Sequence, residues 1–103
     1  MNMEYYQKEA ARTAIYKPEH SVLYPALGLA GEAGEVADKV KKILRDDKFD
    51  RDAIAKEIGD VLWYIAALCR DLNVDMAQVA HDNLAKLRDR QERGKLQGSG
   101  DNR

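Results

Sequence analysis

The chain has 103 residues, of which 34% are charged, and its formal net charge at pH 7 is −1. This length predicts a single domain over residues 1–103, with a core so small that association with other chains would help to stabilise it. The balanced charge gives no electrostatic basis for binding a nucleic-acid polymer or a membrane surface. The single cysteine excludes disulfides, and no apolar run is long enough for a secretory signal or a membrane span. We therefore expect a cytoplasmic protein.

The composition is typical of helices, because Ala, Leu, Glu, Lys and Arg dominate and no alternating strand pattern occurs. The first predicted helix covers residues 3–16 and ends before Pro18, since the residue that precedes proline avoids helical backbone angles. The second starts near residue 21 or 24 and runs to 45, with Pro25 tolerated in its first turn. The third covers residues 51–71.

The fourth predicted helix covers residues 75–93. It begins with a capping-box-like pair, Asp75 and Gln78, and ends where Gly94 follows. Residues 95–103 form a polar C-terminal tail. Together these elements predict an all-α, four-helix bundle-like subunit.

The third predicted helix is apolar on every side between Val61 and Cys69. A subunit of four helices cannot bury one of them all round, so another chain should cover the face that carries Trp63 and Ala67. We expect a homodimer or a dimer of dimers, and the alternative is a monomer with an exposed tryptophan. Cys69 is interpreted as a small, reduced core residue.

Three glycines, Gly28, Gly31 and Gly34, recur at every third position of the second predicted helix. Each glycine costs about 1 kcal/mol relative to alanine in a helix interior, so the series requires a reason. Close approach of a neighbouring helix is one explanation, and space for a bulky ligand beside the acidic residues is the other. The sequence leaves both open.

An acidic pair with i, i+3 spacing occurs on each of two consecutive helices: Glu32 and Glu35 on the second, Glu57 and Asp60 on the third. Residues three apart are neighbours on a helix surface, and the short connection forces the two helices to pack antiparallel. The carboxylates can therefore converge at the edge of the core, where their repulsion requires a cation. Oxygen ligands without His or Cys favour Mg²⁺, with Mn²⁺ as a substitute. The alternative is that both pairs are solvated.

The fourth predicted helix carries Asn83, Lys86 and Arg90 along or beside its inward face. A buried Asn needs hydrogen-bond partners, and two cations next to it suit an anion such as a phosphate chain. The two cationic side chains could instead extend from the edge of the core into solvent.

Two segments together resemble the signature of MazG-like pyrophosphohydrolases, which belong to the all-α nucleoside triphosphate pyrophosphohydrolase superfamily. They are Gly-Glu-Ala-Gly-Glu-Val-Ala-Asp at 31–38 and Lys-Glu-Ile-Gly-Asp-Val-Leu-Trp-Tyr at 56–64. The family pattern is Glu-x-x-Glu, a spacer, and Glu-x-x-Asp, and the acidic pairs of this chain match it. The resemblance extends over nearly the whole chain.

The resemblance implies Mg²⁺-dependent hydrolysis of a ribo- or deoxyribonucleoside triphosphate to the monophosphate and pyrophosphate, in the manner of nucleotide-pool cleaning. It implies that Glu32, Glu35, Glu57 and Asp60 hold the metal. It also implies that Asn83, Lys86 and Arg90 contact the nucleotide, with Tyr64 as a wall of the base pocket.

Many members of the family have a further Glu directly before the first motif acid, where this chain has Gly31. A metal ligand, Glu35, would then have to serve as the general base. The rival interpretation is a non-catalytic helical oligomerisation module with solvated acidic faces.

Overall fold

The computed structural model describes residues 1–103 and contains helices but no strand, which confirms the predicted all-α class. The elements are α1 (Met3–Ala10), α2 (Leu23–Asp46), α3 (Arg51–Asp71) and α4 (Met76–Glu92), with two short 3₁₀ helices, η1 (Ala11–Thr13) and η2 (Pro18–His20), between α1 and α2. The predicted bounds of α2, α3 and α4 are correct to within one or two residues. None of these helices combines the length and the apolar composition that crossing a bilayer requires.

The first helix is shorter than the sequence predicted. It ends at Ala10 and tightens into η1, where the Thr13 hydroxyl donates to the carbonyl oxygen of Ala10 at 3.0 Å. A side-chain hydroxyl that bonds the backbone in this way competes with continued α-helix. Ala14 then leaves helical geometry, with φ −84° and ψ 89°, well before Pro18 is reached.

Side chains that accept backbone N–H groups fix the starts of α1, α3 and α4. They are Asn2, Asp50 and Asp75, each of which satisfies a donor that has no partner within its helix. The capping box predicted for α4 is only half formed, because Gln78 donates to Asp82 at 2.8 Å instead of reaching back to the cap.

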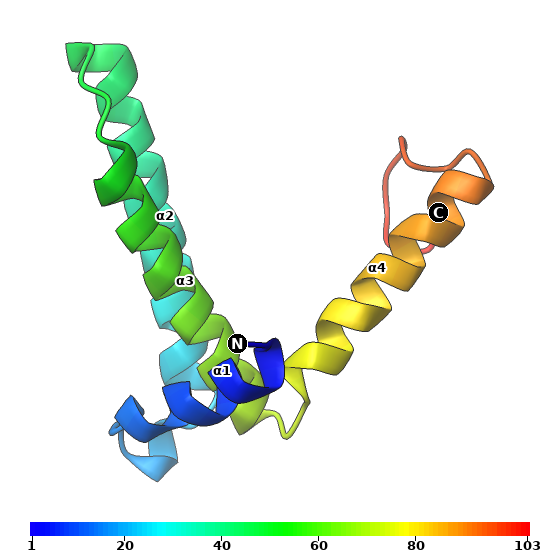
Figure 1. Ribbon diagram of the computed structural model, residues 1–103, viewed down its shortest axis with the longest axis horizontal. Coiled ribbons are helices and arrows are strands. Elements are labelled where there is room, and N and C mark those ends of the chain that lie inside the picture. Colours follow the sequence, from blue (N-terminus) through cyan, green and yellow to red (C-terminus); the bar gives the residue numbers. More distant parts are fainter.

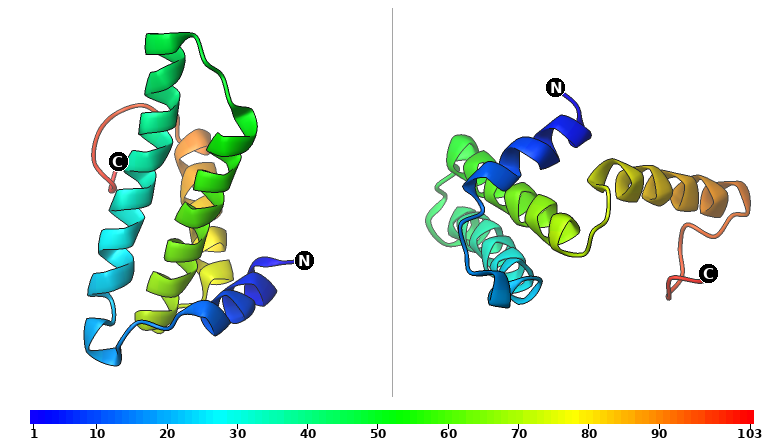
Figure 2. Two further views of the ribbon diagram at one scale, coloured as in Figure 1. Left: turned by 90° about the vertical axis from the view of Figure 1, so that its left-hand side faces the viewer. Right: turned by 90° about the horizontal axis from the view of Figure 1, so that it is seen from below.

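Helices α2 and α3 form a long antiparallel hairpin, whereas α4 leaves the end of α3 and points away from it (Figures 1 and 2). The subunit is therefore an open V, and the prediction of a bundle-like subunit is wrong. The radius of gyration is 16.4 Å, compared with about 13 Å for a compact domain of this length. The sequence could not reveal this, because an apolar helix face shows that a helix is covered but not by which chain.

The small core lies where α1, α3 and the start of α4 meet. Ala66, Cys69 and Met76 are buried there, which confirms Cys69 as a reduced core residue. Gln7 of α1 holds the α3–α4 turn, since its amide group donates to the carbonyl of Val74 at 3.0 Å and accepts from the N–H of Met76 at 2.8 Å.

The N-terminal segment covers the face of α3 that we expected a second subunit to cover. The Trp63 indole N–H donates to the Thr13 hydroxyl at 2.8 Å, and Ala67 is only 4% exposed within the single chain. Ala67 therefore needs no second subunit to bury it, whereas Trp63 is only partly buried and its place in an interface stays a prediction. Other apolar side chains, such as Leu27 on α2 and Leu84 on α4, are the ones left largely exposed.

A buried carboxylate anchors the start of α2. Asp71, whose side chain is 4% exposed, accepts from the Tyr16 hydroxyl at 2.6 Å and from the Val22 N–H at 2.9 Å. Val22 has a φ of 67°, which β-branched residues avoid, so this contact holds an unfavourable backbone conformation. Burial opposes ionisation of Asp71, but the hydrogen bonds from Tyr16, Val22 and Arg70 outweigh it and lower its pKa. Burial, followed by the bond to Asp71, raises the pKa of Tyr16 to about 12.

Candidate metal centre

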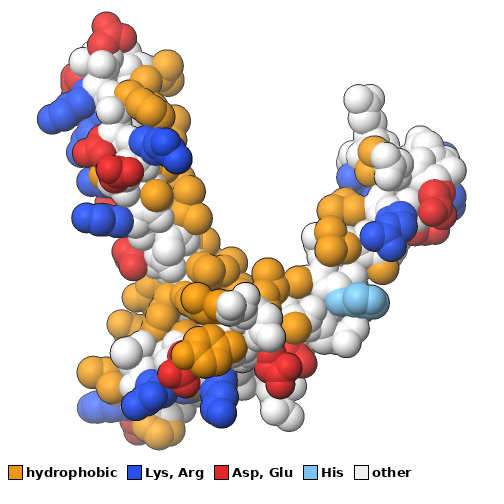
Figure 3. Space-filling model, viewed as in Figure 1, with side chains coloured by type: hydrophobic (Ala, Val, Ile, Leu, Met, Phe, Trp, Pro, Cys, Tyr) orange, Lys and Arg blue, Asp and Glu red, His pale blue; other side chains and the backbone are white.

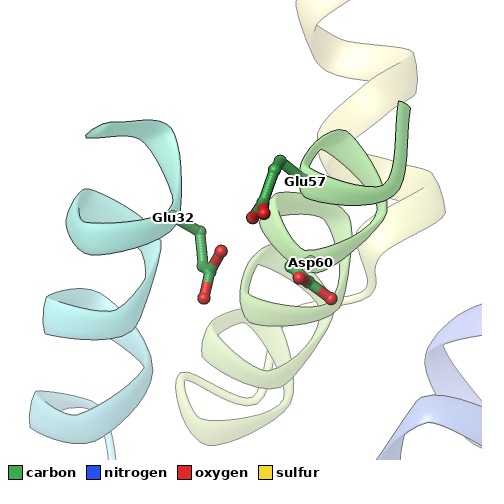
Figure 4. Close-up of side chains that lie close together, drawn as sticks. All are labelled: Glu32, Glu57 and Asp60. Atoms are coloured by element: carbon green, nitrogen blue, oxygen red, sulfur yellow. The ribbon is translucent and has the colours of Figure 1, made fainter. Parts of the chain in front are cut away.

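Three acidic residues converge between the two helices of the hairpin. Glu32 lies on α2, while Glu57 and Asp60 lie one turn apart on α3, and Figure 4 shows Glu32 and Glu57 extending into the space between the helices with Asp60 close by on α3. One oxygen of each lies within 4.8 Å of one oxygen of each of the others. The i, i+3 spacing and the antiparallel hairpin thus bring these three together as the sequence predicted.

Glu32 is the most constrained of the three acids. Its Oε2 atom is buried and has no hydrogen-bond partner. The pKa of Glu32 is raised, first because a hydrogen bond to Glu57 favours the protonated form, then by desolvation and by the nearby negative charges of Asp60, Glu57 and Glu35. When both are ionised, neither Glu32 nor Glu57 can donate, so the buried oxygen is left unsatisfied, which is costly.

No basic side chain neutralises the cluster. None of the ion pairs within the chain involves Glu32, Glu57 or Asp60. Lys42 of α2 pairs instead with Asp38, at 3.6 Å. The donor set consists of carboxylate oxygens only, which suits a hard divalent cation such as Mg²⁺ or Mn²⁺. The orphaned oxygen of Glu32 and the absence of a competing cation both fit such an ion.

Glu35 is not part of this group. Its side chain is exposed, and it acts on the cluster only through its charge, as one of the groups that raise the pKa of Glu32. Its role as a fourth ligand or as the general base remains a prediction. The i, i+3 spacing placed Glu35 on the same side of α2 as Glu32, but it could not tell whether the Glu35 side chain would reach the cluster.

Tyrosines form one wall beside the acids. Tyr16 stacks on Tyr24 with 4.8 Å between ring centroids, and Tyr24 lies 6.1 Å from Tyr64. Tyr64 follows Asp60 by one turn of α3, and its pKa is raised first by a hydrogen bond with Tyr24, then by burial and by the nearby charges, which include Glu32 and Asp60. The sequence singled out Tyr64, but not Tyr16 or Tyr24. No helical periodicity links Tyr16 to Tyr24, because Tyr16 precedes α2 whereas Tyr24 lies in its first turn. The two segments are held together by Asp71, which bonds Tyr16 and the Val22 N–H.

The glycine series on α2 is explained at one position. A Cβ atom on Gly28 would overlap the Tyr64 ring, whereas Cβ atoms on Gly31 and Gly34 would meet nothing within 4 Å. Close approach by α3 is therefore the reason for Gly28. The surroundings of Gly31 and Gly34 are open, as the ligand explanation requires, although no contact accounts for either glycine.

The predicted phosphate contacts lie on the other arm of the V. Asn83 is exposed on α4, contrary to the expectation of a buried amide, because α4 has no helix packed against that face. Lys86 and Arg90 bind a residue of the C-terminal tail, Asp101. A single chain therefore does not bring these residues together with the acids of the hairpin.

The fold and the site define an all-α protein with a cluster of three carboxylates, which could hold a metal ion, between two antiparallel helices. The sequence model of the MazG nucleotide pyrophosphohydrolase domain matches residues 20–94, and the chain belongs to this family. It is similar to the Gene 37 protein of Mycobacterium phage L5, with 46% identity over an alignment 114 residues long that covers 100% of both chains. No solved structure matches the chain. Membership supports a hydrolase of the nucleotide pyrophosphohydrolase type at the level of the family.

Proposed function

We propose that this protein hydrolyses ribo- or deoxyribonucleoside triphosphates to the monophosphate and pyrophosphate, using Mg²⁺ or Mn²⁺, and removes unwanted nucleotides from the pool. The observation that carries the proposal is the buried, unpartnered Oε2 of Glu32 within a three-carboxylate cluster of a MazG-family chain. A solvated acidic face would have its oxygens in water, so this feature favours a metal site over the oligomerisation module.

Each group near the cluster has a role in this proposal. Glu32, Glu57 and Asp60 hold the metal, with Glu35 as the fourth acid at its exposed edge. When bound, the metal supplies neutralising charge for the phosphates and Lewis acidity. Glu35 orients the attacking water and accepts its proton. Tyr64, supported by Tyr24, packs against the nucleoside.

The amount of exposed surface supports self-association. The accessible surface is 7876 Å², compared with about 5,800 Å² for a compact monomer of this mass. An excess of about 2,000 Å² per chain lies in the range of obligate interfaces. Figure 3 shows apolar side chains along the facing sides of both arms of the V. A second chain seated there would place its α4, with Lys86 and Arg90, near the acids of the first chain, which would complete a shared site.

We expect light scattering at micromolar concentration to give a mass of two or four chains, each of 11.6 kDa. The double variant Leu27→Glu/Leu84→Glu should be monomeric, because both side chains, 74% and 61% exposed in the single chain, would place charge in an apolar interface. Arg88→Glu, an exposed charge change on α4, is the control. A monomeric wild-type chain would refute the shared site.

The activity is tested by measuring pyrophosphate release from the standard ribo- and deoxyribonucleoside triphosphates in millimolar Mg²⁺. We expect release from at least one of them, with loss in excess chelator. If none is hydrolysed, the oligomerisation module becomes the better interpretation.

Mg²⁺ should also raise the melting temperature without any nucleotide present. A ligand that binds only the native state stabilises it by about 2.7 kcal/mol at a hundredfold excess over its dissociation constant. Glu57→Gln should weaken this response, because it removes a charged ligand while preserving shape. Calorimetry with and without Mg²⁺ measures both, and Asp52→Asn, at the exposed start of α3, is the matched control. An identical response in wild type and Glu57→Gln would place the metal elsewhere.

A further inference from the structure

The C-terminal tail folds back along α4 instead of extending from it (Figure 1). Its last residue closes the tail on itself: the Arg103 guanidinium donates to backbone carbonyl oxygens of Lys95, Leu96 and Gly100, at 2.8 to 3.1 Å. Arg93 of α4 donates to the carbonyl oxygen of Arg103 at 2.8 Å. The tail is thus a closed loop that returns to the helix from which it starts.

Asp101 of this loop contacts Lys86 and Arg90, the two cationic residues that the sequence predicted to bind phosphate. Its Oδ1 accepts from Lys86 Nζ at 2.8 Å and from Arg90 Nη2 at 3.1 Å, and its carbonyl oxygen accepts from Arg90 as well. One carboxylate and one carbonyl of the same residue therefore contact both cationic side chains. These contacts reproduce those expected of a phosphate group, which also presents several oxygens to convergent donors.

The two sides of this contact differ in exposure. The Arg90 side chain is 5% exposed, whereas the Asp101 side chain is 77% exposed. A cation this deeply buried requires an anionic partner, and the partner that Arg90 has is an exposed carboxylate on a loop, where an external anion can approach and replace it. The pKa of Asp101 is lowered by its hydrogen bonds to Lys86 and Arg90, so it stays ionised at neutral pH.

We propose that Asp101 is an internal occupant of an anion site formed by Lys86 and Arg90, and that the phosphate chain of the substrate displaces it and opens the tail. This inference rests on the proposed function, because it identifies the external anion as a nucleoside triphosphate. Because Asp101 blocks the site in part of the molecules, the apparent affinity for the phosphate chain equals the intrinsic affinity multiplied by the fraction of molecules in which the site is free. The tail thereby selects polyphosphates, whose charge can displace a carboxylate, over smaller anions.

The test uses inorganic tripolyphosphate, titrated by calorimetry into the 103-residue chain at physiological ionic strength without divalent metal, so that no metal at the acidic cluster binds the anion. Asp101→Asn should bind tripolyphosphate about three- to fivefold more tightly than wild type, as expected if the tail occupies the site for most of the time. Asp82→Asn is the matched control, because it removes a similarly exposed negative charge one turn from Lys86 without releasing the tail. The tripolyphosphate affinity of Asp82→Asn should stay within about 1.5-fold of that of wild type, because exposed charges are screened by salt.

Displacement is observed separately from affinity through the backbone amide resonances of Gly98 and Gly100, which lie in the loop. Saturating tripolyphosphate should move these wild-type resonances toward their positions in Asp101→Asn. The proposal is overturned if Asp101→Asn and Asp82→Asn gain the same affinity for tripolyphosphate or if neither variant gains affinity. It is also overturned if the loop resonances do not move. Tighter binding by Asp101→Asn in a protein that hydrolyses no nucleotide would leave the anion site standing and refute the hydrolase. Nucleotide hydrolysis combined with an unchanged tripolyphosphate affinity of Asp101→Asn would support the hydrolase and refute the occupation of the anion site by Asp101.

Discussion

Replacing Asp60 with Asn should reduce pyrophosphate release at least about a hundredfold, since even residues that only support metal ligands cost 10- to 100-fold when changed. The substitution is nearly isosteric and the side chain is exposed, so the hairpin and the assembly should remain intact. It removes one negative charge and one hard oxygen ligand, which are the properties that a Mg²⁺ site requires. Initial rates with a substrate found in the nucleotide panel measure the effect.

The control for this variant is again Asp52→Asn on α3, which should retain wild-type activity. Circular dichroism and light scattering establish that fold and assembly are unchanged. Full activity of Asp60→Asn would show that the reaction occurs but that the metal is bound elsewhere.

The same variant should melt at a higher temperature than wild type when no metal is present. Asp60 is one of the charges that raise the pKa of Glu32. A carboxyl group whose folded-state pKa is raised binds more protons in the folded state, so stability falls as the pH rises through that pKa. Removing the charge of Asp60 reduces this loss at neutral pH. Millimolar Mg²⁺ should reverse the order, because it stabilises the wild type alone.

Replacing Gly28 with Ala should destabilise the protein by about 1–3 kcal/mol, the usual cost of forcing extra volume into a packed contact. A methyl group there would overlap the Tyr64 ring, and the ring cannot move without disturbing its contacts with Tyr24 and Trp63. The direction is opposite to helix propensity, which by itself favours alanine by about 1 kcal/mol. Urea unfolding measures the change in the free energy of unfolding.

Gly31→Ala provides the matched control on the same helix, because its Cβ atom would meet nothing within 4 Å. This variant should gain up to about 1 kcal/mol from propensity alone. In a Tyr64→Ala background the penalty at Gly28 should disappear, which a double-mutant cycle detects as a coupling between the two positions. Equal effects of Gly28→Ala and Gly31→Ala would mean that Tyr64 does not pack on Gly28.

The sequence alone determined the features of this protein that depend on neighbouring residues. The bounds of α2, α3 and α4 followed from local composition and, at α4, from the cap Asp75, which acts within its own first turn. The convergence of Glu32, Glu57 and Asp60 followed from i, i+3 spacing and a connection too short for anything but an antiparallel hairpin.

Only the tertiary structure decided the features that depend on residues far apart in the chain. Glu32 and Glu35 share one helix face by spacing, but only the packing of α3 showed that one oxygen of Glu32 is buried while Glu35 is exposed. Likewise, nothing local to Lys86 and Arg90 specifies Asp101 as their partner, since a loop must close to bring it there. The open V has the same origin: an apolar helix face requires burial, but burial is non-directional, and the sequence does not state which surface provides it.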